Sequence, residues 1–153
     1  MIHFRYGKYC MYQNQCFDFF TKENGKCVLR AGTEYKESLV KMGFYKYADL
    51  VYILEVNPED IQSAYRVHVE ADYKGFICAV YDMTDHDIVN LAPSIEYERM
   101  SGDYTKPGYD PQLNIKESEL DDIWEERTPI EGFKFDVEPI VYLKKDGVWL
   151  VEH

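Results

Sequence analysis

The chain has 153 residues, which is long enough for one domain with a substantial hydrophobic core. Its 46% hydrophobic and 29% charged residues are typical of a globular protein and exclude a disordered chain. The formal net charge of −11 disfavours direct binding of nucleic acid, because such binding needs a basic surface that displaces counterions.

The N-terminal residues predict strands joined by a tight turn. Residues 4–20 are rich in aromatic side chains, which favours one or two strands. The dipeptide Asn24-Gly25 tolerates the positive φ angles of a type I′ turn. We therefore expect Cys16–Phe20 and Cys27–Arg30 to pair as a hairpin.

A short helix is expected next. Thr33 is a typical N-cap residue, and Tyr35, Leu39 and Met42 follow at the spacing of one helical face. Gly43 stands where a glycine usually ends a helix.

The middle of the chain predicts three strands. Residues 50–56 contain few polar interruptions, and residues 57–60 predict a short helical turn. Residues 65–73 alternate between apolar and polar side chains, which indicates a strand with one buried face. After a turn at Lys74-Gly75, residues 76–81 are apolar at every position, which indicates a central strand. We expect these last two strands to form an antiparallel hairpin with Val67, Val69 and Val80 in the core.

Regular structure is hard to sustain from residue 93 to residue 112. Several prolines and glycines interrupt this segment, which predicts a long irregular loop that also contains tyrosines. Ser118 then predicts the start of a short acidic helix, in which Leu120, Ile123 and Trp124 share the apolar face.

The C-terminal residues predict further strands. Residues 133–137 alternate between apolar and polar side chains, and Asp146-Gly147 predicts a hairpin between residues 140–143 and 148–151. The whole pattern predicts an α+β fold in a single domain over residues 1–153. We expect a mostly antiparallel twisted sheet of about seven strands with two short helices.

The densest group of ionisable side chains follows the strand at residues 76–81. Asp82, Asp85 and His86 could hold a divalent ion or orient an imidazole. Their spacing matches no calcium loop, and the chain has no H-E-x-x-H motif and no phosphate-binding glycine motif. A solvated turn is the favoured interpretation, and we expect neither a metal nor a cofactor.

The cysteines favour a reducing compartment. No pair of them forms a C-x-x-C motif, and neither a secretory signal nor an apolar run of membrane-spanning length is evident. We therefore expect cytoplasmic localisation and reduced, mostly buried thiols, with a disulfide-bonded secreted domain as the alternative. The thiols concerned are Cys10, Cys16, Cys27 and Cys78.

Negative charge is concentrated after residue 50. Residues 1–50 hold eight Lys/Arg and five Asp/Glu, whereas residues 51–153 hold nine and 23. Such an acidic surface would attract a basic protein. The leading hypothesis is a non-enzymatic binding protein, for example a bacterial immunity or inhibitor protein that neutralises a basic, nuclease-like partner. The residues expected to bind this partner are Asp121, Asp122, Glu125, Glu126, Tyr104 and Tyr109.

The alternative hypothesis is a small-molecule-binding domain or a small enzyme. Its site would lie near Asp82, Asp85 and His86, at the rim of a pocket lined by aromatic side chains. A deep apolar cavity would favour this alternative, whereas a flat acidic face would favour the protein-binding hypothesis. The sequence leaves the oligomeric state open.

Overall fold

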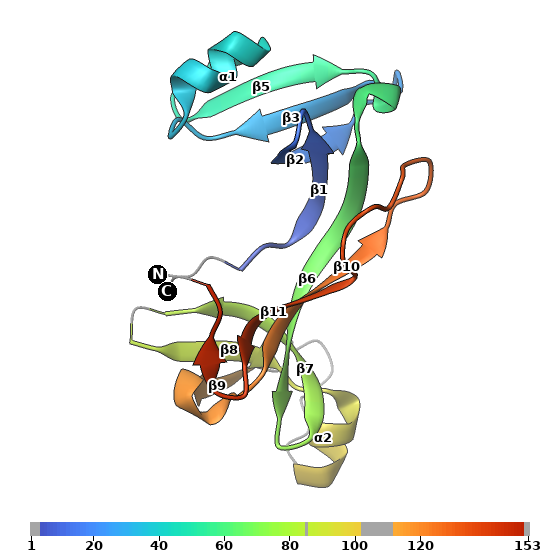
Figure 1. Ribbon diagram of the computed structural model, residues 1–153. Coiled ribbons are helices and arrows are strands. Elements are labelled where there is room, and N and C mark those ends of the chain that lie inside the picture. The colour runs from blue at the N-terminus through green and yellow to red at the C-terminus, as the bar shows by residue number, and fades with distance from the viewer. Residues whose placement is uncertain (1–3, 85, 102–111, 152–153) are drawn as a thin grey trace. The chain divides into compact units, whose positions relative to one another are not determined.

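The computed structural model describes residues 4–84, 86–101 and 112–151 (Figure 1). The chain divides into two compact units, which we describe separately. Unit 1 comprises Met1–Tyr6, Val67–Arg127 and Glu138–His153, and unit 2 comprises Gly7–Arg66 and Thr128–Val137.

Unit 2 is a strand-rich unit with one helix. Its own elements are β1 (Gly7–Tyr12), β2 (Gln15–Thr21), β3 (Cys27–Ala31), α1 (Lys36–Met42), β4 (Tyr45–Ala48), β5 (Val51–Val56) and the 3₁₀ turn η1 (Pro58–Asp60). Helix α1 follows Tyr35 rather than the expected Thr33. It ends at Gly43, whose φ of 105° is the left-handed conformation that favours glycine.

Unit 1 is also built mainly of strands. Its own elements are β7 (Phe76–Met83), β8 (Ile88–Ala92), α2 (Ile95–Ser101), β9 (Leu113–Lys116), the 3₁₀ turn η2 (Glu117–Glu119), β11 (Ile140–Lys145) and β12 (Val148–Trp149). Two longer strands, β6 (Ser63–Tyr73) and β10 (Ile123–Pro129), contain residues of both units. The expectation of a single domain over residues 1–153 stays a prediction.

The strands of the described residues form a twelve-stranded sheet, so the expectation of about seven strands was wrong. The hydrogen-bonded order is β12-β11-β10-β6-β1-β2-β3-β5-β4, and β7 pairs with β6 and β8, which in turn pairs with β9. Short strands such as β4, β8 and β9 were missed, because four or five residues carry too little periodicity to be distinguished from a loop.

Three predicted hairpins are confirmed, but the type I′ turn expected at Asn24-Gly25 is wrong, because only Gly25 of this pair has positive φ and five residues, 22–26, separate β2 from β3. Strands β2 and β3 pair from Thr21 and Cys27, β6 and β7 pair across Lys74-Gly75, and β11 and β12 pair across Asp146-Gly147. In the last two turns both residues have positive φ, at 53° and 85° and at 51° and 79°. Type I′ turns require this geometry.

The acidic helix expected after Ser118 is wrong. Residues 117–119 form only the turn η2, and residues 123–129 are strand β10. The helical spacing of Leu120, Ile123 and Trp124 was misleading. In β10 the two buried residues are Ile123 and Glu125, and one of them is charged, so the sequence does not show the apolar–polar alternation of a strand. A buried charge masks the alternation of a strand.

Two further segments differ from expectation. Helix α2 lies within residues 93–112, which were expected to be an irregular loop, while residues 102–111 lie outside the described residues. Residues 133–137 form no strand. Strand β7 is interior in the sheet, as expected, but only one of its faces is buried, since Ile77 is 57% exposed and Val80 is fully buried.

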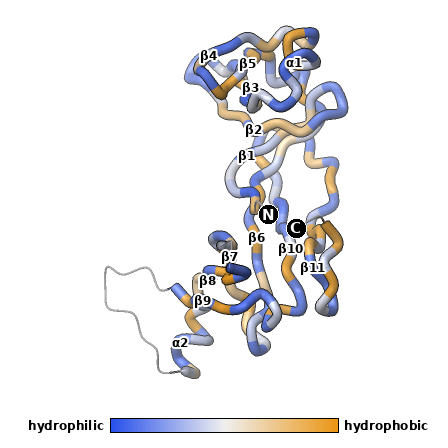
Figure 2. Tube along the Cα trace, turned by 90° about the vertical axis from the view of Figure 1, so that its left-hand side faces the viewer, coloured by the Kyte–Doolittle hydropathy of each residue, from blue (hydrophilic) through white to orange (hydrophobic). Residues whose placement is uncertain are grey.

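Each unit has its own hydrophobic core. In unit 1 the core includes Val69, Val80, Leu91 and Ile123, and in unit 2 it includes Leu29. Figure 2 shows hydrophobic residues interspersed with hydrophilic ones along β6, as expected for a strand with one buried face. None of the helices within the described residues is both long and apolar enough to cross a membrane.

Candidate functional site

The sheet of unit 2 has two apolar faces. Strands β2, β3, β5 and β4 are successive neighbours in the sheet, and one of their faces packs into the core together with Leu39 of α1. The opposite face carries Phe20, Val28 and Ile53, which alternate with the core residues. The outer face of an antiparallel sheet is usually polar, so this apolar face is unusual.

The strand register brings the side chains of this outer face together. Phe20 is the cross-strand neighbour of Val28, and Val28 is also the neighbour of Glu55. Ile53 is the neighbour of both Arg30 and Tyr45. Cross-strand neighbours lie about 4.5–5.5 Å apart at their Cβ atoms, so these residues form one continuous surface.

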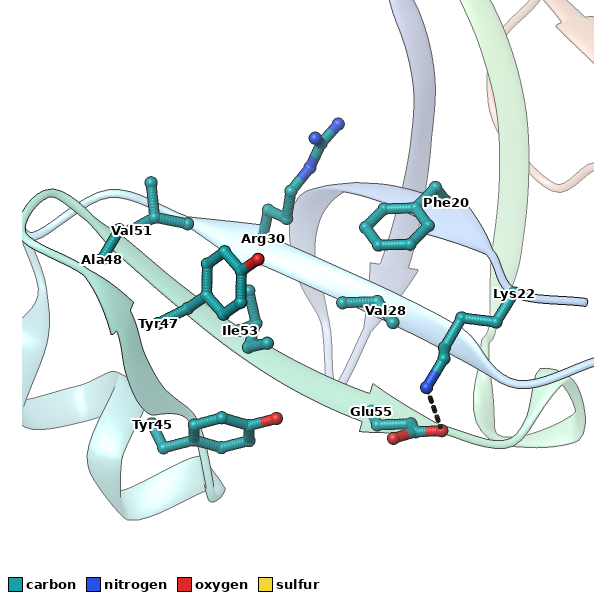
Figure 3. A pocket seen from close by; sticks show the side chains of 10 residues that line it. All are labelled: Phe20, Lys22, Val28, Arg30, Tyr45, Tyr47, Ala48, Val51, Ile53 and Glu55. Atoms are coloured by element: carbon teal, nitrogen blue, oxygen red, sulfur yellow. Dashed lines mark ion pairs between the residues drawn. The ribbon is translucent and has the colours of Figure 1, made fainter. Parts of the chain in front are cut away.

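This surface is hollowed, and the hollow has a volume of about 660 Å³. Its lining consists of Phe20, Lys22, Val28, Arg30, Tyr45, Tyr47, Ala48, Val51, Ile53 and Glu55. Figure 3 shows these side chains converging from four strands, with Lys22 and Glu55 at one end and Ala48 and Val51 at the other. We call this hollow the aromatic face of unit 2.

Large hydrophobic side chains on the aromatic face are exposed. Phe20 is 41% exposed, Tyr45 54% and Tyr47 72%. Single exposed hydrophobic residues are common on proteins, whereas several of them lie together here on one face, as they do at many binding surfaces. A hollow of this volume is also within the range of small-molecule sites.

The charged residues of the aromatic face make ion pairs within unit 2. Arg30 Nη2 donates to Asp18 Oδ1 at 2.8 Å, and the guanidinium carbon lies 5.3 Å from the centre of the Phe20 ring. Lys22 Nζ lies 3.5 Å from Glu55 Oε1. A guanidinium has five N–H donors, so Arg30 can bind a further acceptor without leaving Asp18. The face therefore combines apolar rings with a fixed cation.

The acidic residues expected to bind a partner have separate roles. Asp121 and Asp122 hold the β11–β12 turn, since Gly147 N donates to the Asp121 carbonyl oxygen at 3.0 Å and Asp146 N donates to Asp122 Oδ1 at 2.8 Å. Tyr104 and Tyr109, which were expected to contribute, lie outside the described residues.

Glu125 is buried and paired with two arginines. Arg5 donates to it through Nε at 3.0 Å and Nη2 at 2.8 Å, and Arg127 Nη2 donates at 3.2 Å. Burial acts to raise the pKa of Glu125, but the hydrogen bonds and charges of both arginines outweigh burial and lower it. Glu125 thus stabilises unit 1, whereas its neighbour Glu126 is accessible and lies 3.4 Å from His68.

Of the group Asp82, Asp85 and His86, Asp82 lies within β7 and His86 follows that strand. Asn90 donates a side-chain hydrogen bond to Asp82, whereas His86 lines a separate hollow of about 200 Å³ beside Asp87 and Lys116. Asp82 does not line that hollow, and Asp85 lies outside the described residues. Thus this hollow does not bring Asp82 and His86 together, although they are four residues apart in sequence.

The aromatic face was missed by the sequence analysis. Each contributing strand shows part of the pattern, for example Tyr45 and Tyr47 two residues apart in β4. The pairing of four strands is needed to join these parts. A second group was also missed: among the described residues, His68, Glu70 and Glu126 could together hold a metal ion. Only the spacing of His68 and Glu70 on one strand was visible in the sequence.

Comparison with known proteins identifies a family. The family model described as Uncharacterised conserved protein UCP033725 matches residues 4–129. This match covers most of the chain, so the chain belongs to that family. Neither a curated protein nor a solved structure matches the chain.

Proposed function

We propose that this member of the family is a non-enzymatic binding protein that takes up a small, flat, mostly apolar molecule carrying an anionic group. The aromatic face of unit 2 would be the binding surface. The observation that carries the proposal is the hollow of about 660 Å³ on a sheet face that exposes Phe20, Tyr45 and Tyr47.

The chemistry of the lining supports this ligand class. Val28 and Ile53, which lie on this face, would contact the apolar body of the ligand, and the exposed tyrosine rings would stack on it. Arg30 would bind the anionic group, because its remaining N–H donors can form charge-assisted hydrogen bonds. Glu55 is paired with Lys22 at one end of the hollow, so its charge would not lie against the apolar body of a ligand in the middle (Figure 3).

The proposal can be tested with anilinonaphthalene sulfonate, a fluorescent aromatic anion of the expected class. We expect the folded protein to bind this probe and Tyr47→Ser or Arg30→Gln to weaken binding about tenfold, which corresponds to about 1.4 kcal/mol. Tyr35→Ser is a matched control, because Tyr35 and Tyr47 are each 72% exposed and Tyr35 does not line the hollow.

Two results would contradict the proposal. One is an absence of probe binding under conditions in which circular dichroism shows a folded protein. The other is equal affinity in the wild type, Tyr47→Ser and Arg30→Gln. Thermal melts of all variants would show whether each substitution leaves the fold intact, as expected for exposed side chains.

Binding of a basic partner is a second candidate function, favoured by the distribution of charge. Unit 1 contains eight Lys/Arg and eighteen Asp/Glu, whereas unit 2 contains nine and ten. An immunity or inhibitor role toward a nuclease-like protein would use this charge. We expect Asp121→Asn, Asp122→Asn and Glu126→Gln together to slow association with polylysine at low salt, and much less at about 1 M salt. Equal association rates of wild type and variant at low salt would show that these three residues do not attract a basic partner.

The proposed compartment is the cytoplasm. All four cysteines are free, and three of them are buried, in agreement with the expectation of mostly buried thiols. Free thiols persist in a reducing environment, which supports this compartment.

A further inference from the structure

A histidine and two glutamates converge on the exposed sheet face of unit 1. His68 and Glu70 are two residues apart in β6, so both point to the same face, while Val67 and Val69 point into the core. Glu126 comes from β10, the neighbouring strand of β6. The three side chains thus meet only because β6 and β10 pair.

The distances among these side chains suit a metal ion. His68 Nε2 lies 2.7 Å from Glu70 Oε1 and 3.4 Å from Glu126 Oε2. One ligand atom from each residue lies within 4.8 Å of the other two. Metal–ligand bonds of about 2.0–2.2 Å in a tetrahedral site place ligand atoms roughly 3.3–3.6 Å apart. The 3.4 Å between His68 Nε2 and Glu126 Oε2 lies in this range. The 2.7 Å between His68 Nε2 and Glu70 Oε1 is shorter, so these two side chains would separate slightly to bind an ion.

The two carboxylates of the group lie close to one imidazole. In the described part of the chain, Glu70 and Glu126 both contact the basic side chain of His68. Arg5 and Arg127 bind Glu125 instead, and Glu125 points away from Glu126 because successive strand residues face opposite sides. A bound cation would relieve the repulsion between the two carboxylates.

We infer that His68, Glu70 and Glu126 form a binding site for a divalent first-row transition metal ion, of which Zn²⁺ is the representative. One imidazole and two carboxylates suit such an ion better than Mg²⁺ or Ca²⁺, which prefer oxygen ligands alone. Three protein ligands leave a coordination position for water or another ligand, and the 42% exposure of the His68 side chain keeps that position accessible.

The direct test is titration of untagged protein with Zn²⁺ and, separately, with Mg²⁺ by calorimetry. We expect about one Zn²⁺ per chain and much weaker binding of Mg²⁺. His68→Gln and Glu126→Gln should each raise the Kd for Zn²⁺ at least tenfold. The matched controls are His86→Gln and Glu131→Gln, which replace exposed residues outside the site and should leave the Kd unchanged.

Substitution with Co²⁺ identifies the ligands. Binding at this site should give visible absorption of Co²⁺ without the ultraviolet charge-transfer band of a cobalt thiolate, which separates it from binding at a cysteine. No Zn²⁺ binding, a thiolate band, or equal Zn²⁺ affinity in wild type and both variants would overturn the inference. Metal-free melting curves should be the same for all proteins, because His68 and Glu126 are both partly exposed. Anilinonaphthalene sulfonate binding should also be unaffected, since the aromatic face belongs to unit 2.

Discussion

Replacement of Glu125 by glutamine should destabilise unit 1 strongly. The Glu125 side chain is 8% exposed and accepts hydrogen bonds from Arg5 and Arg127, whose side chains are 27% and 16% exposed. Glutamine has nearly the same shape but no charge, and its amide group would direct N–H donors toward the guanidinium groups. Glu125→Gln would therefore remove the carboxylate to which both arginines donate hydrogen bonds.

The expected loss of stability follows from the burial of this cluster. Removal of one partner from a buried ion pair typically costs about 3–5 kcal/mol, because the remaining charge stays buried and unpaired. For a protein of this size, 1 kcal/mol lowers the Tm by about 2–4 °C, so the Tm should fall by roughly 6–20 °C. Tryptophan fluorescence is a suitable assay, because Trp124 and Trp149 both belong to unit 1.

The difference between wild type and Glu125→Gln should also depend on pH. The pKa of Glu125 is lower in the folded protein than its ordinary value of about 4.3, so its stabilising contribution is complete above that value. The contribution is lost as the pH falls through the lowered pKa, because the carboxylate becomes protonated. Urea unfolding curves of the two proteins should therefore differ at pH 7 and converge at strongly acidic pH.

Glu126→Gln is the matched control for this prediction. Glu126 is adjacent in the same strand, but its side chain is 38% exposed and its ion pair is with a histidine. We expect a change of less than about 0.5 kcal/mol, as is usual for exposed positions. If Glu125→Gln were no more destabilising than Glu126→Gln at pH 7, the buried cluster would not contribute to stability and the reasoning would be wrong.

Two further predictions concern the core and the thiols. Val80→Ala should cost about 1–3 kcal/mol in urea unfolding, because Val80 is fully buried, whereas Ile77→Ala in the same strand should cost much less; equal costs would contradict the assigned strand faces. In thiol labelling of the native protein, Cys16 should react first, because the other three thiols are buried and burial raises the pKa of Cys10 to about 12. All four thiols should react in urea. If the native Cys16→Ser protein were still labelled rapidly, Cys16 would not be the most reactive thiol and the prediction would be wrong.

Local sequence determined the features that depend on neighbouring residues. Asp146-Gly147 and Lys74-Gly75 predicted the correct hairpins, because positive φ angles at both positions select a turn whatever surrounds it. Helix α1 was also predicted, with Leu39 on its buried side and Gly43 at its end. The alternation in β6 correctly indicated that Val67 and Val69 lie in the core.

Tertiary structure decided the features that depend on distant partners. Glu125 is buried because Arg5, 120 residues earlier, forms two hydrogen bonds with it, and a buried charge cannot be predicted from local alternation. The same strand places Glu126 beside His68, 58 positions earlier in the chain. The aromatic face likewise requires the pairing of four strands, none of which shows the surface alone. Strand pairing joins residues that are far apart in the chain, so both candidate sites became visible only in the folded protein.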